Sequence, residues 1–253
     1  MDSPVIEIRD LWFSFNGQIV LKEVNLNIYQ KDFLGVIGPN GGGKTTLLKL
    51  MLGLLEADRG SILVFGRPPK QSAHRIGYVP QNIGFNKSFP ILALDVVLMG
   101  RLKIGRGRSR LSKQDRSLAQ KALEQVGMWE HRGCRIEELS GGQQQKVFIA
   151  RSLVTKPEIL FLDEPTSSVD TKGQTDLYAL LRDFNETVTI VMASHDLMVL
   201  SSHIKSVACV NQNVEFHEAG EITREMIEMA YHCPVELIAH GFPHRVLRIH
   251  ENH

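Results

Sequence analysis

The hydrophobic pattern of the chain alternates between short strand-like runs and longer helix-like stretches. Apolar and polar residues alternate at Val5 to Ile8 and at Val20 to Ile28, which predicts two strands that each bury one face. The apolar run Phe33 to Ile37 predicts a fully buried strand, and Ile159 to Leu162 and Val188 to Met192 are two further short apolar runs. Polar or glycine-rich residues and then a helical pattern follow each of these three runs. This alternation predicts a parallel α/β sheet with functional loops at the strand ends.

The pattern changes between about Asn82 and Glu138, where longer helical periods replace the short apolar runs. One example is Ser112 to Val126, in which apolar residues recur at helical spacing. Few segments in this part of the chain have the composition of a strand. We therefore expect residues 82–150 to form a helical subdomain inserted into the sheet domain.

The composition indicates a globular chain with a sizeable core. Of its 253 residues, 43% are hydrophobic and 23% are charged, which suffices for a core without disulfides or a structural metal. The 29 basic and 28 acidic residues give a net charge of +1, so no global field favours nucleic acid or an anionic membrane. Cys134, Cys209 and Cys233 form neither a disulfide framework nor a metal knuckle by their spacing, which favours a reducing compartment.

The sequence carries no pattern of an export signal or a membrane span. Its first ten residues, MDSPVIEIRD, lack a basic stretch followed by an apolar one. No apolar run approaches the roughly 18 to 20 residues needed to cross a bilayer. We therefore expect a soluble chain that is not secreted.

A glycine-rich turn follows Phe33 to Ile37 and precedes a predicted helix at Thr45 to Leu52. It matches the phosphate-binding loop pattern. The loop consists of Gly38, Pro39, Asn40, Gly41, Gly42, Gly43, Lys44 and Thr45, and Thr46 follows it. Glycines allow successive backbone N–H groups and the helix N-terminus to face an anion. We expect Lys44 to reach the β- and γ-phosphates of a nucleotide and Thr45 to bind Mg²⁺. The alternative is a glycine turn beside an unrelated lysine, which the strand before it and the helix after it disfavour.

Two adjacent carboxylates, Asp163 and Glu164, end the apolar run Ile159 to Leu162. Neighbouring residues at a strand end point in different directions, so the two acids can have different tasks. Asp163 is suited to the coordination of Mg²⁺, and Glu164 is suited to orient or deprotonate an attacking water. Alone, such acids could be an ordinary strand terminus. Their position downstream of a phosphate loop favours the catalytic interpretation.

The segment Leu139-Ser140-Gly141-Gly142-Gln143 precedes a predicted helix at Gln144 to Val154, so its free N–H groups again suit an anion. This pentapeptide resembles the signature of ABC ATPases. Other motifs of that family occur in the expected order. They are Gln81 in Tyr78-Val-Pro-Gln81, the loop Ser167-Ser-Val-Asp170, and His195 in Ser194-His-Asp196. The resemblance covers essentially residues 5 to 220. His195 alone would more often be structural, but its position after Val188 to Met192 matches the switch histidine of the family.

The resemblance implies a role for each matching residue. Phe15 would stack on adenine, where many relatives have a tyrosine, and its aromatic face preserves the stacking. Gln81 would sense the γ-phosphate and the metal, which gives a metal set of Thr45, Gln81 and Asp163. The catalytic set is Glu164, His195, Gln81 and Lys44. Ser140, Gly141 and Gly142 of the signature would contact the nucleotide bound by a second copy of the chain. Gln143 and Asp170 are also expected to bind the nucleotide.

The resemblance also implies an architecture and partners. The expected fold is an α/β P-loop NTPase core with an N-terminal antiparallel β subdomain and an inserted α-helical subdomain. Residues 1–81 and 151–220 would form the nucleotide-binding core, 82–150 the helical subdomain with the signature, and 221–253 a tail of the same single domain. The cofactors would be ATP and Mg²⁺. The chain would dimerise on binding ATP and lie on the cytoplasmic face of the cell membrane, beneath integral membrane permease subunits. No nucleic acid is expected as a partner.

Two stretches resemble the group of ABC proteins that serve zinc, manganese and iron(II) importers. They are Ser88 to Arg101, which lies where the permease docks in relatives, and Cys233 to Leu247. An extracytoplasmic metal-binding protein would then be an indirect partner. Another cargo, such as an iron chelate, a cofactor or an exported lipid, remains an alternative. An ABC ATPase acting on nucleic acid is a weaker one, because such relatives usually carry a long coiled coil or two cassettes.

The C-terminal part of the chain is rich in histidine. Six of the ten histidines fall between His217 and His253, with Cys233 among them. The spacings from His240 to His244 and from His244 to His250 define no tetrahedral site. A regulatory metal site and a packing or solvated tail therefore both remain open, and the sequence favours the second.

Overall fold

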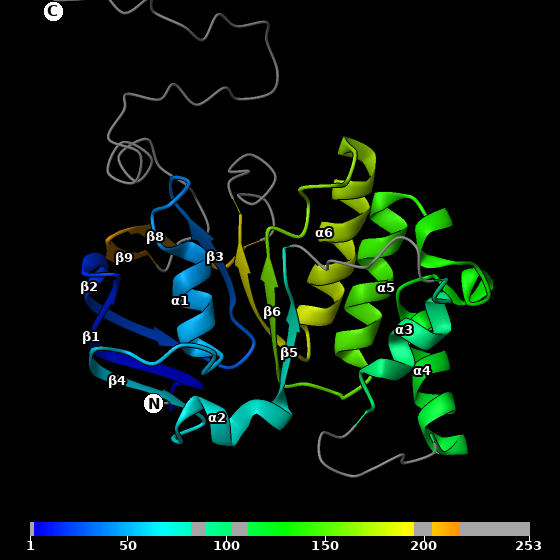
Figure 1. The fold of residues 1–253 in the computed structure, drawn as a ribbon, viewed down its shortest axis with the longest axis horizontal. Helices are drawn as coiled ribbons and strands as arrows, with labels where there is room; N and C mark the ends of the chain where they lie inside the picture. The colour runs from blue at the N-terminus through cyan, green and yellow to red at the C-terminus, as the bar shows by residue number, and fades with distance from the viewer. Residues whose placement is uncertain (1–2, 82–89, 103–110, 195–203, 218–253) are drawn as a thin grey trace, which may run out of the picture.

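The structure is a computed structural model that describes residues 3–81, 90–102, 111–194 and 204–217. Two β-sheets and two groups of helices make up this part of the chain (Figure 1). The α/β fold expected from the sequence is confirmed, including the antiparallel sheet at the N-terminus and the helices between the strands.

The larger sheet has six strands in the order β5-β6-β7-β3-β8-β9. In chain order these strands are β3 Phe33–Ile37, β5 Ile76–Val79, β6 Ile159–Asp163, β7 Thr189–Ala193, β8 Ser206–Asn211 and β9 Asn213–His217. The first five in the sheet are parallel, and β9 is antiparallel to β8. Every residue of β3, β6 and β7 is buried, as the continuous apolar runs indicate. Because β3, β5, β6 and β7 are parallel, the loops after them meet at one edge.

The smaller sheet is antiparallel, with β1 Ile6–Phe15 between β2 Gln18–Ile28 and β4 Arg59–Val64. The sequence predicted its first strand only over Val5 to Ile8. The strand continues because its pairing shifts register after Ile8, next to Asp10 with φ of 44°. The irregularity moves the next buried side chain from the expected position 10 to Leu11. The simple alternation therefore stops while the strand does not.

Helix α1, Lys44–Met51, lies between the two sheets (Figure 1). Its buried residues Leu47 and Leu48 share one core with Ile6 and Phe161. The short helix α2, Pro69–Ser72, follows the smaller sheet. The sequence predicted α1 at Thr45 to Leu52, one residue later at each end.

Four helices share one core on the other side of the larger sheet (Figure 1). They are α3 Ala93–Met99, α4 Lys113–Gln125, α5 Gly141–Leu153 and α6 Thr171–Asn185. Three short 3₁₀ helices complete the described elements: η1 Ala73–Arg75, η2 Trp129–His131 and η3 Ile136–Glu138. Alternate residues of β6 point to the two cores, Ile159 and Phe161 to the α1 side and Leu160 and Leu162 to the other.

Two helix boundaries follow from capping. Helix α4 lies inside the predicted range, and the hydroxyl of Ser112 accepts a hydrogen bond from the N–H of Asp115 at its start. Helix α5 begins at Gly141 and not at Gln144 as predicted, because Ser140 is its N-cap. The predicted boundary of the helical subdomain at residue 150 falls inside α5 and stays a prediction. None of the helices in the described ranges is long and apolar enough to cross a membrane.

Candidate functional site

The glycine-rich loop connects β3 to α1 in a backbone conformation that residues other than glycine rarely adopt. Gly38, Gly41 and Gly43 have φ values of 147°, 80° and 107°. A Cβ at Gly38 would lie 2.0 Å from the carbonyl oxygen of Val210, and one at Gly42 would lie 2.8 Å from it. The loop therefore packs its backbone directly on β8, where no side chain fits. The N–H of Gly42 donates to the carbonyl of Pro39 at 3.1 Å, while the N-terminus of α1 presents its first N–H groups to an anion.

Lys44 is buried, with 7% of its surface exposed, and its ammonium folds back over the loop. Its Nζ donates to the carbonyl oxygens of Gly38 at 2.9 Å and Pro39 at 3.1 Å. Burial lowers the pKa of Lys44, while the carboxylates of Glu164 and Asp163 act in the opposite direction. The site thus holds a desolvated cation whose interaction with a phosphate is favoured.

Asp163 is the last residue of β6 and only 2% exposed. Its Oδ1 accepts a hydrogen bond from the hydroxyl of Thr45 at 3.0 Å. Burial raises the pKa of Asp163, the hydrogen bond from Thr45 lowers it, and the charge of Glu164 raises it further. A buried carboxylate beside a hydroxyl oxygen is a pair of hard donors of the kind that Mg²⁺ prefers.

Tyr78 is a neighbour of this pair that the sequence did not mark as a site residue. It lies in β5, and its hydroxyl is hydrogen-bonded to Asp163. Burial, followed by the charge of Asp163, raises the pKa of Tyr78 to about 12, so the phenol stays protonated and donates. The sequence did not mark Tyr78 because its contact with Asp163 depends on the pairing of β5 with β6, which residue order alone does not show.

Glu164 leaves the sheet in a direction different from that of Asp163. Its φ of 50° is in the left-handed region, which is uncommon outside glycine. Its N–H donates to the carbonyl of Ala193 at 2.9 Å, and its Oε1 lies 3.8 Å from Nζ of Lys44. The two acids therefore face different partners, Asp163 the hydroxyl of Thr45 and Glu164 the ammonium of Lys44. This agrees with the divergence expected at a strand end.

A cavity of about 210 Å³ opens over the loop. It is lined by Asn40, Gly41, Gly43, Lys44, Thr45, Thr46, Gln81 and Glu164. The structure therefore brings together the glycine loop, the exposed Gln81 and one of the two carboxylates, which are far apart in the sequence. His195 lies outside the described residues.

The signature segment forms the start of α5. The hydroxyl of Ser140 accepts from the N–H of Gln143 at 3.3 Å, and the N–H of Ser140 donates to Oε1 of Gln143 at 2.9 Å. A Cβ at Gly141 would lie 2.0 Å from the carbonyl oxygen of Ser168, so the signature packs on the loop that follows Glu164. In the described part of the chain, residues 140–143 do not line the cavity over the phosphate loop.

Two further predicted site residues lie at element ends. Asp170 is the N-cap of α6, where its side chain accepts from the N–H of Gly173 at 3.1 Å. Phe15 ends β1 and is 61% exposed, so one ring face is open to a planar ligand. Pro39, also predicted as a site residue, lies in the phosphate loop, where its carbonyl oxygen accepts a hydrogen bond from Nζ of Lys44.

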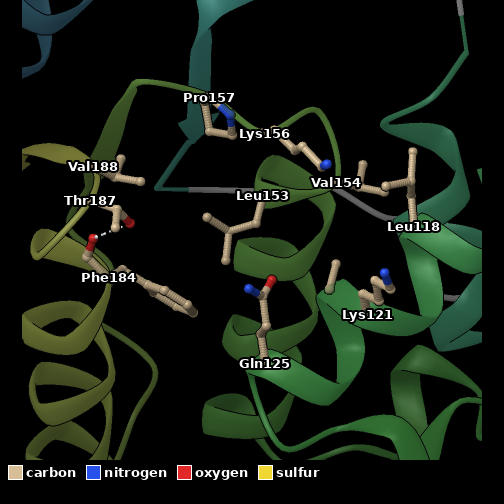
Figure 2. Close-up of a pocket in the computed structure, with 11 residues that line it drawn as sticks. Leu118, Lys121, Gln125, Leu153, Val154, Lys156, Pro157, Phe184, Thr187 and Val188 are labelled. Carbon is tan, nitrogen blue, oxygen red and sulfur yellow. Dashed lines mark hydrogen bonds between the residues drawn. The ribbon is translucent and has the colours of Figure 1, made fainter.

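A second cavity of about 320 Å³ lies between α4, the end of α5 and the end of α6 (Figure 2). Figure 2 shows Leu153 and Phe184 beside this hollow, with Lys121 and Lys156 at its edge. Pro157 and Val188, which also line it, precede β6 and β7. The phosphate loop follows a strand, so the second cavity is at the opposite end of the sheet and is not part of the candidate site. Within the described ranges, no cluster of three or more histidine, cysteine or acidic residues could hold a metal ion.

Comparison with known proteins agrees with this geometry. The model of the family described as ABC transporter matches residues 21–167. The zinc uptake system ATP-binding protein ZurA of Listeria innocua is 38% identical over 221 residues, 85% of each chain. The high-affinity zinc uptake system ATP-binding protein ZnuC of Bacillus subtilis is 39% identical, over 76% of this chain and 84% of that protein. The manganese transport system ATP-binding protein MntB of Bacillus subtilis is 38% identical, over 80% and 85%.

Solved structures show the same fold. An inward-facing ABC transporter superposes with a TM-score of 0.83 at 28% identity, over 92% of this chain and 91% of that chain. CbiO1 from Clostridium perfringens, part of an ABC transporter complex, has a TM-score of 0.76 at 26% identity, over 86% and 89%. The fold and its glycine loop are those of a P-loop ATPase. The chain belongs to the ABC transporter family, and it is the ATP-binding, ATP-hydrolysing subunit of a membrane transporter.

Proposed function

We propose that the chain hydrolyses ATP to power the import of a divalent metal ion, zinc or manganese. The observation that carries this proposal is the identity of 38 to 39%, over most of both chains, with subunits of zinc and manganese transport systems. The stretches Ser88 to Arg101 and Cys233 to Leu247, which resemble the same group, support it. Residues 82–89 and the second stretch lie outside the described residues.

The nucleotide chemistry is assigned to residues around the phosphate loop. Backbone N–H groups among residues 40–46 other than that of Gly42, which donates to Pro39, bind the phosphates together with the ammonium of Lys44. Phe15 stacks on the adenine. Thr45, Asp163 and Gln81 would hold Mg²⁺, which would neutralise charge on the phosphates. The hydrogen bond between Thr45 and Asp163 supports this, because it already aligns two of the three oxygen donors.

Hydrolysis is assigned to Glu164, and the resemblance adds Gln81 and His195 to the catalytic set. Glu164 lies in the cavity that also holds Lys44 and Gln81, so it can orient or deprotonate a water in line with the γ-phosphate. Phosphoryl transfer needs positioning and charge stabilisation more than covalent chemistry. Lys44, whose Nζ lies 3.8 Å from Oε1 of Glu164, stabilises the charge that develops on the phosphate.

We assign the signature to the nucleotide of a second copy of the chain and keep Asp170 among the nucleotide-binding residues. Ser140, Gly141, Gly142 and Gln143 start a helix whose N-terminus is suited to a phosphate, yet they do not line the chain's own cavity among the described residues. ATP would thus close two chains into a dimer. Permease subunits would dock on the helical subdomain 82–150, at the cytoplasmic face of the membrane, and an extracytoplasmic metal-binding protein would deliver the cargo.

The test is elemental analysis of whole cells that lack the gene, grown under metal limitation. The strain is complemented with the native chain or with Glu164→Gln, and an empty vector serves as the control. We expect a selective fall in zinc or manganese that only the native chain restores. Unchanged metal contents would contradict metal import and leave another cargo, without affecting the ATPase assignment.

A further inference from the structure

The start of the signature helix has a contact from outside the signature, at His131 in η2. The ring Nε2 of His131 lies 3.3 Å from the carboxamide Nε2 of Gln143. No nucleotide role is assigned to His131, and its ring Nδ1 is buried. Among the residues that the structure describes, Nδ1 has no hydrogen-bond partner.

The hydrogen bonds fix which atom of Gln143 faces His131. The backbone N–H of Ser140 can only donate, so the atom of Gln143 that lies 2.9 Å from it must be the carboxamide oxygen. The carboxamide NH₂ is then the group that faces the imidazole, and the ring Nε2 must accept from it. The proton of a neutral His131 ring is consequently on Nδ1.

This arrangement leaves a buried N–H without a partner, which is unfavourable. The ring keeps this orientation only if another interaction compensates for the unpaired N–H. Here that interaction is the contact with Gln143, which holds the carboxamide in the one orientation that serves Ser140. Ser140 in turn caps α5 through its hydroxyl, although that bond is long at 3.3 Å. The chain of contacts therefore runs from His131 through Gln143 to Ser140.

We infer that His131 is a positioning residue for the signature, acting through Gln143 on the Ser140 cap that faces the partner's ATP. This rests on the proposed function, in which two chains close around ATP. Two contacts from outside therefore fix the segment, the packing of Gly141 on Ser168 and the contact of Gln143 with His131. Without the acceptor, the carboxamide of Gln143 is free to rotate away from Ser140, and the signature loses its preorganised shape.

The test measures the ATP concentration that dimerises the full chain carrying Glu164→Gln, followed by sedimentation. His131→Leu removes the acceptor and should raise this concentration about tenfold, the effect of one lost hydrogen bond. His131→Gln restores an acceptor and should stay within about threefold of the native value. His131→Asn keeps polarity, but its side chain is too short to reach Gln143, so it should behave as His131→Leu. Glu130→Ala, on the same 3₁₀ helix and exposed, is the matched control and should change nothing.

Two companion measurements separate positioning from general damage. Binding of trinitrophenyl-ATP by the dilute single chain should be unchanged in all variants, because the phosphate loop is not involved. The melting temperatures of His131→Gln and His131→Asn should agree, so that stability cannot account for their difference in dimerisation.

The inference is overturned if His131→Leu and His131→Asn dimerise at the native ATP concentration. It is also overturned if His131→Gln is impaired as strongly as they are. If the chain with native His131 and Glu164→Gln never dimerises with ATP, the proposed dimer fails and this inference fails with it.

Discussion

The hydroxyl of Thr45 donates to Oδ1 of Asp163 at 3.0 Å, although 118 residues separate them in the chain. This bond joins the first turn of α1 to the end of β6. It places the two proposed Mg²⁺ ligands side by side, within a cluster that also contains Lys44 and Glu164.

Replacing Glu164 with glutamine should separate binding from hydrolysis. The change keeps the size of the side chain and removes the group proposed to act on water. We expect ATP affinity to remain near native while hydrolysis falls by about 10²- to 10⁴-fold. Phosphate release under single-turnover conditions, with equilibrium binding measured in parallel, checks both parts. Native turnover in Glu164→Gln would refute the role assigned to Glu164.

Replacing Asp163 with asparagine should stabilise the chain in the absence of nucleotide and Mg²⁺. Because burial raises the pKa of Asp163, the folded chain holds its proton at pH values where the unfolded chain has released it. The stability of the native chain therefore falls as pH rises from the ordinary aspartate pKa of 3.8 through the raised value. We expect the melting temperature of Asp163→Asn to exceed that of the native chain, by a margin that grows from pH 4 to pH 7.

Mg²⁺ and ATP should reverse this order at pH 7. They stabilise the native chain through its carboxylate and stabilise Asp163→Asn less. Two results would contradict the assignment of Asp163. One is a difference in melting temperature that does not depend on pH, and the other is an equal rise in melting temperature with Mg²⁺ and ATP in both proteins.

The caps Ser140 and Ser112 offer a matched pair, because each starts a helix with the same reciprocal hydrogen bonds. Alanine at either position should lower the free energy of unfolding by about 1 kcal/mol. Only the change at Ser140 should lower ATPase activity. A bulky residue, as in Ser140→Phe, should also prevent ATP-dependent dimerisation while the single chain still binds nucleotide. Equal ATPase activities of Ser140→Ala and Ser112→Ala would argue against contact between the signature and a second ATP.

Phe15 and Leu54 are both 61% exposed, but only Phe15 is proposed to touch the nucleotide. Phe15→Ala should weaken ATP binding roughly three- to tenfold through the loss of stacking. Phe15→Tyr should restore it, and Leu54→Ala should have no effect. Isothermal titration of the single chain measures all three. An unchanged affinity in Phe15→Ala would place the adenine elsewhere.

Gly141 and Gly133 differ in the space around them. A Cβ at Gly141 would meet the backbone of Ser168, whereas one at Gly133 has no atom within 4 Å among the described residues. Gly141→Ala should therefore impair ATP-dependent dimerisation and Gly133→Ala should not. Sedimentation of both variants in the Glu164→Gln background checks this. Equal behaviour would show that the contact between the signature and residue 168 is not required.

Much of this site is visible in the sequence because its residues follow one another locally. The phosphate loop and the acidic pair each lie in a short segment at a strand end, so their chemistry follows from residue order. The start of α5 was also within reach. Ser140 followed three residues later by Gln143 is a capping-box pattern, and it places the helix at Gly141 and not at Gln144.

Other features depend on pairing that residue order does not show. Tyr78 reaches Asp163 only because β5 lies next to β6, and the contact between His131 and Gln143 depends on how η2 packs beside α5. The extension of β1 to Phe15 was missed because the shift in register interrupts the alternation of apolar residues. Tertiary packing decides such features.

The contact between Gly141 and Ser168 has a consequence for how two ATP sites would communicate. The loop from Glu164 to Asp170 is tightly folded, with hydrogen bonds from the N–H of Ser167 to Glu164 and from the N–H of Val169 to Thr166. In the proposed dimer, where the signature faces the other ATP, a displacement at Glu164 would therefore reach the signature within a few residues. The two sites would not bind and hydrolyse ATP independently of each other. Hydrolysis would rise sigmoidally with ATP concentration, and a mixed dimer with one Glu164→Gln chain would retain less than half of the native rate.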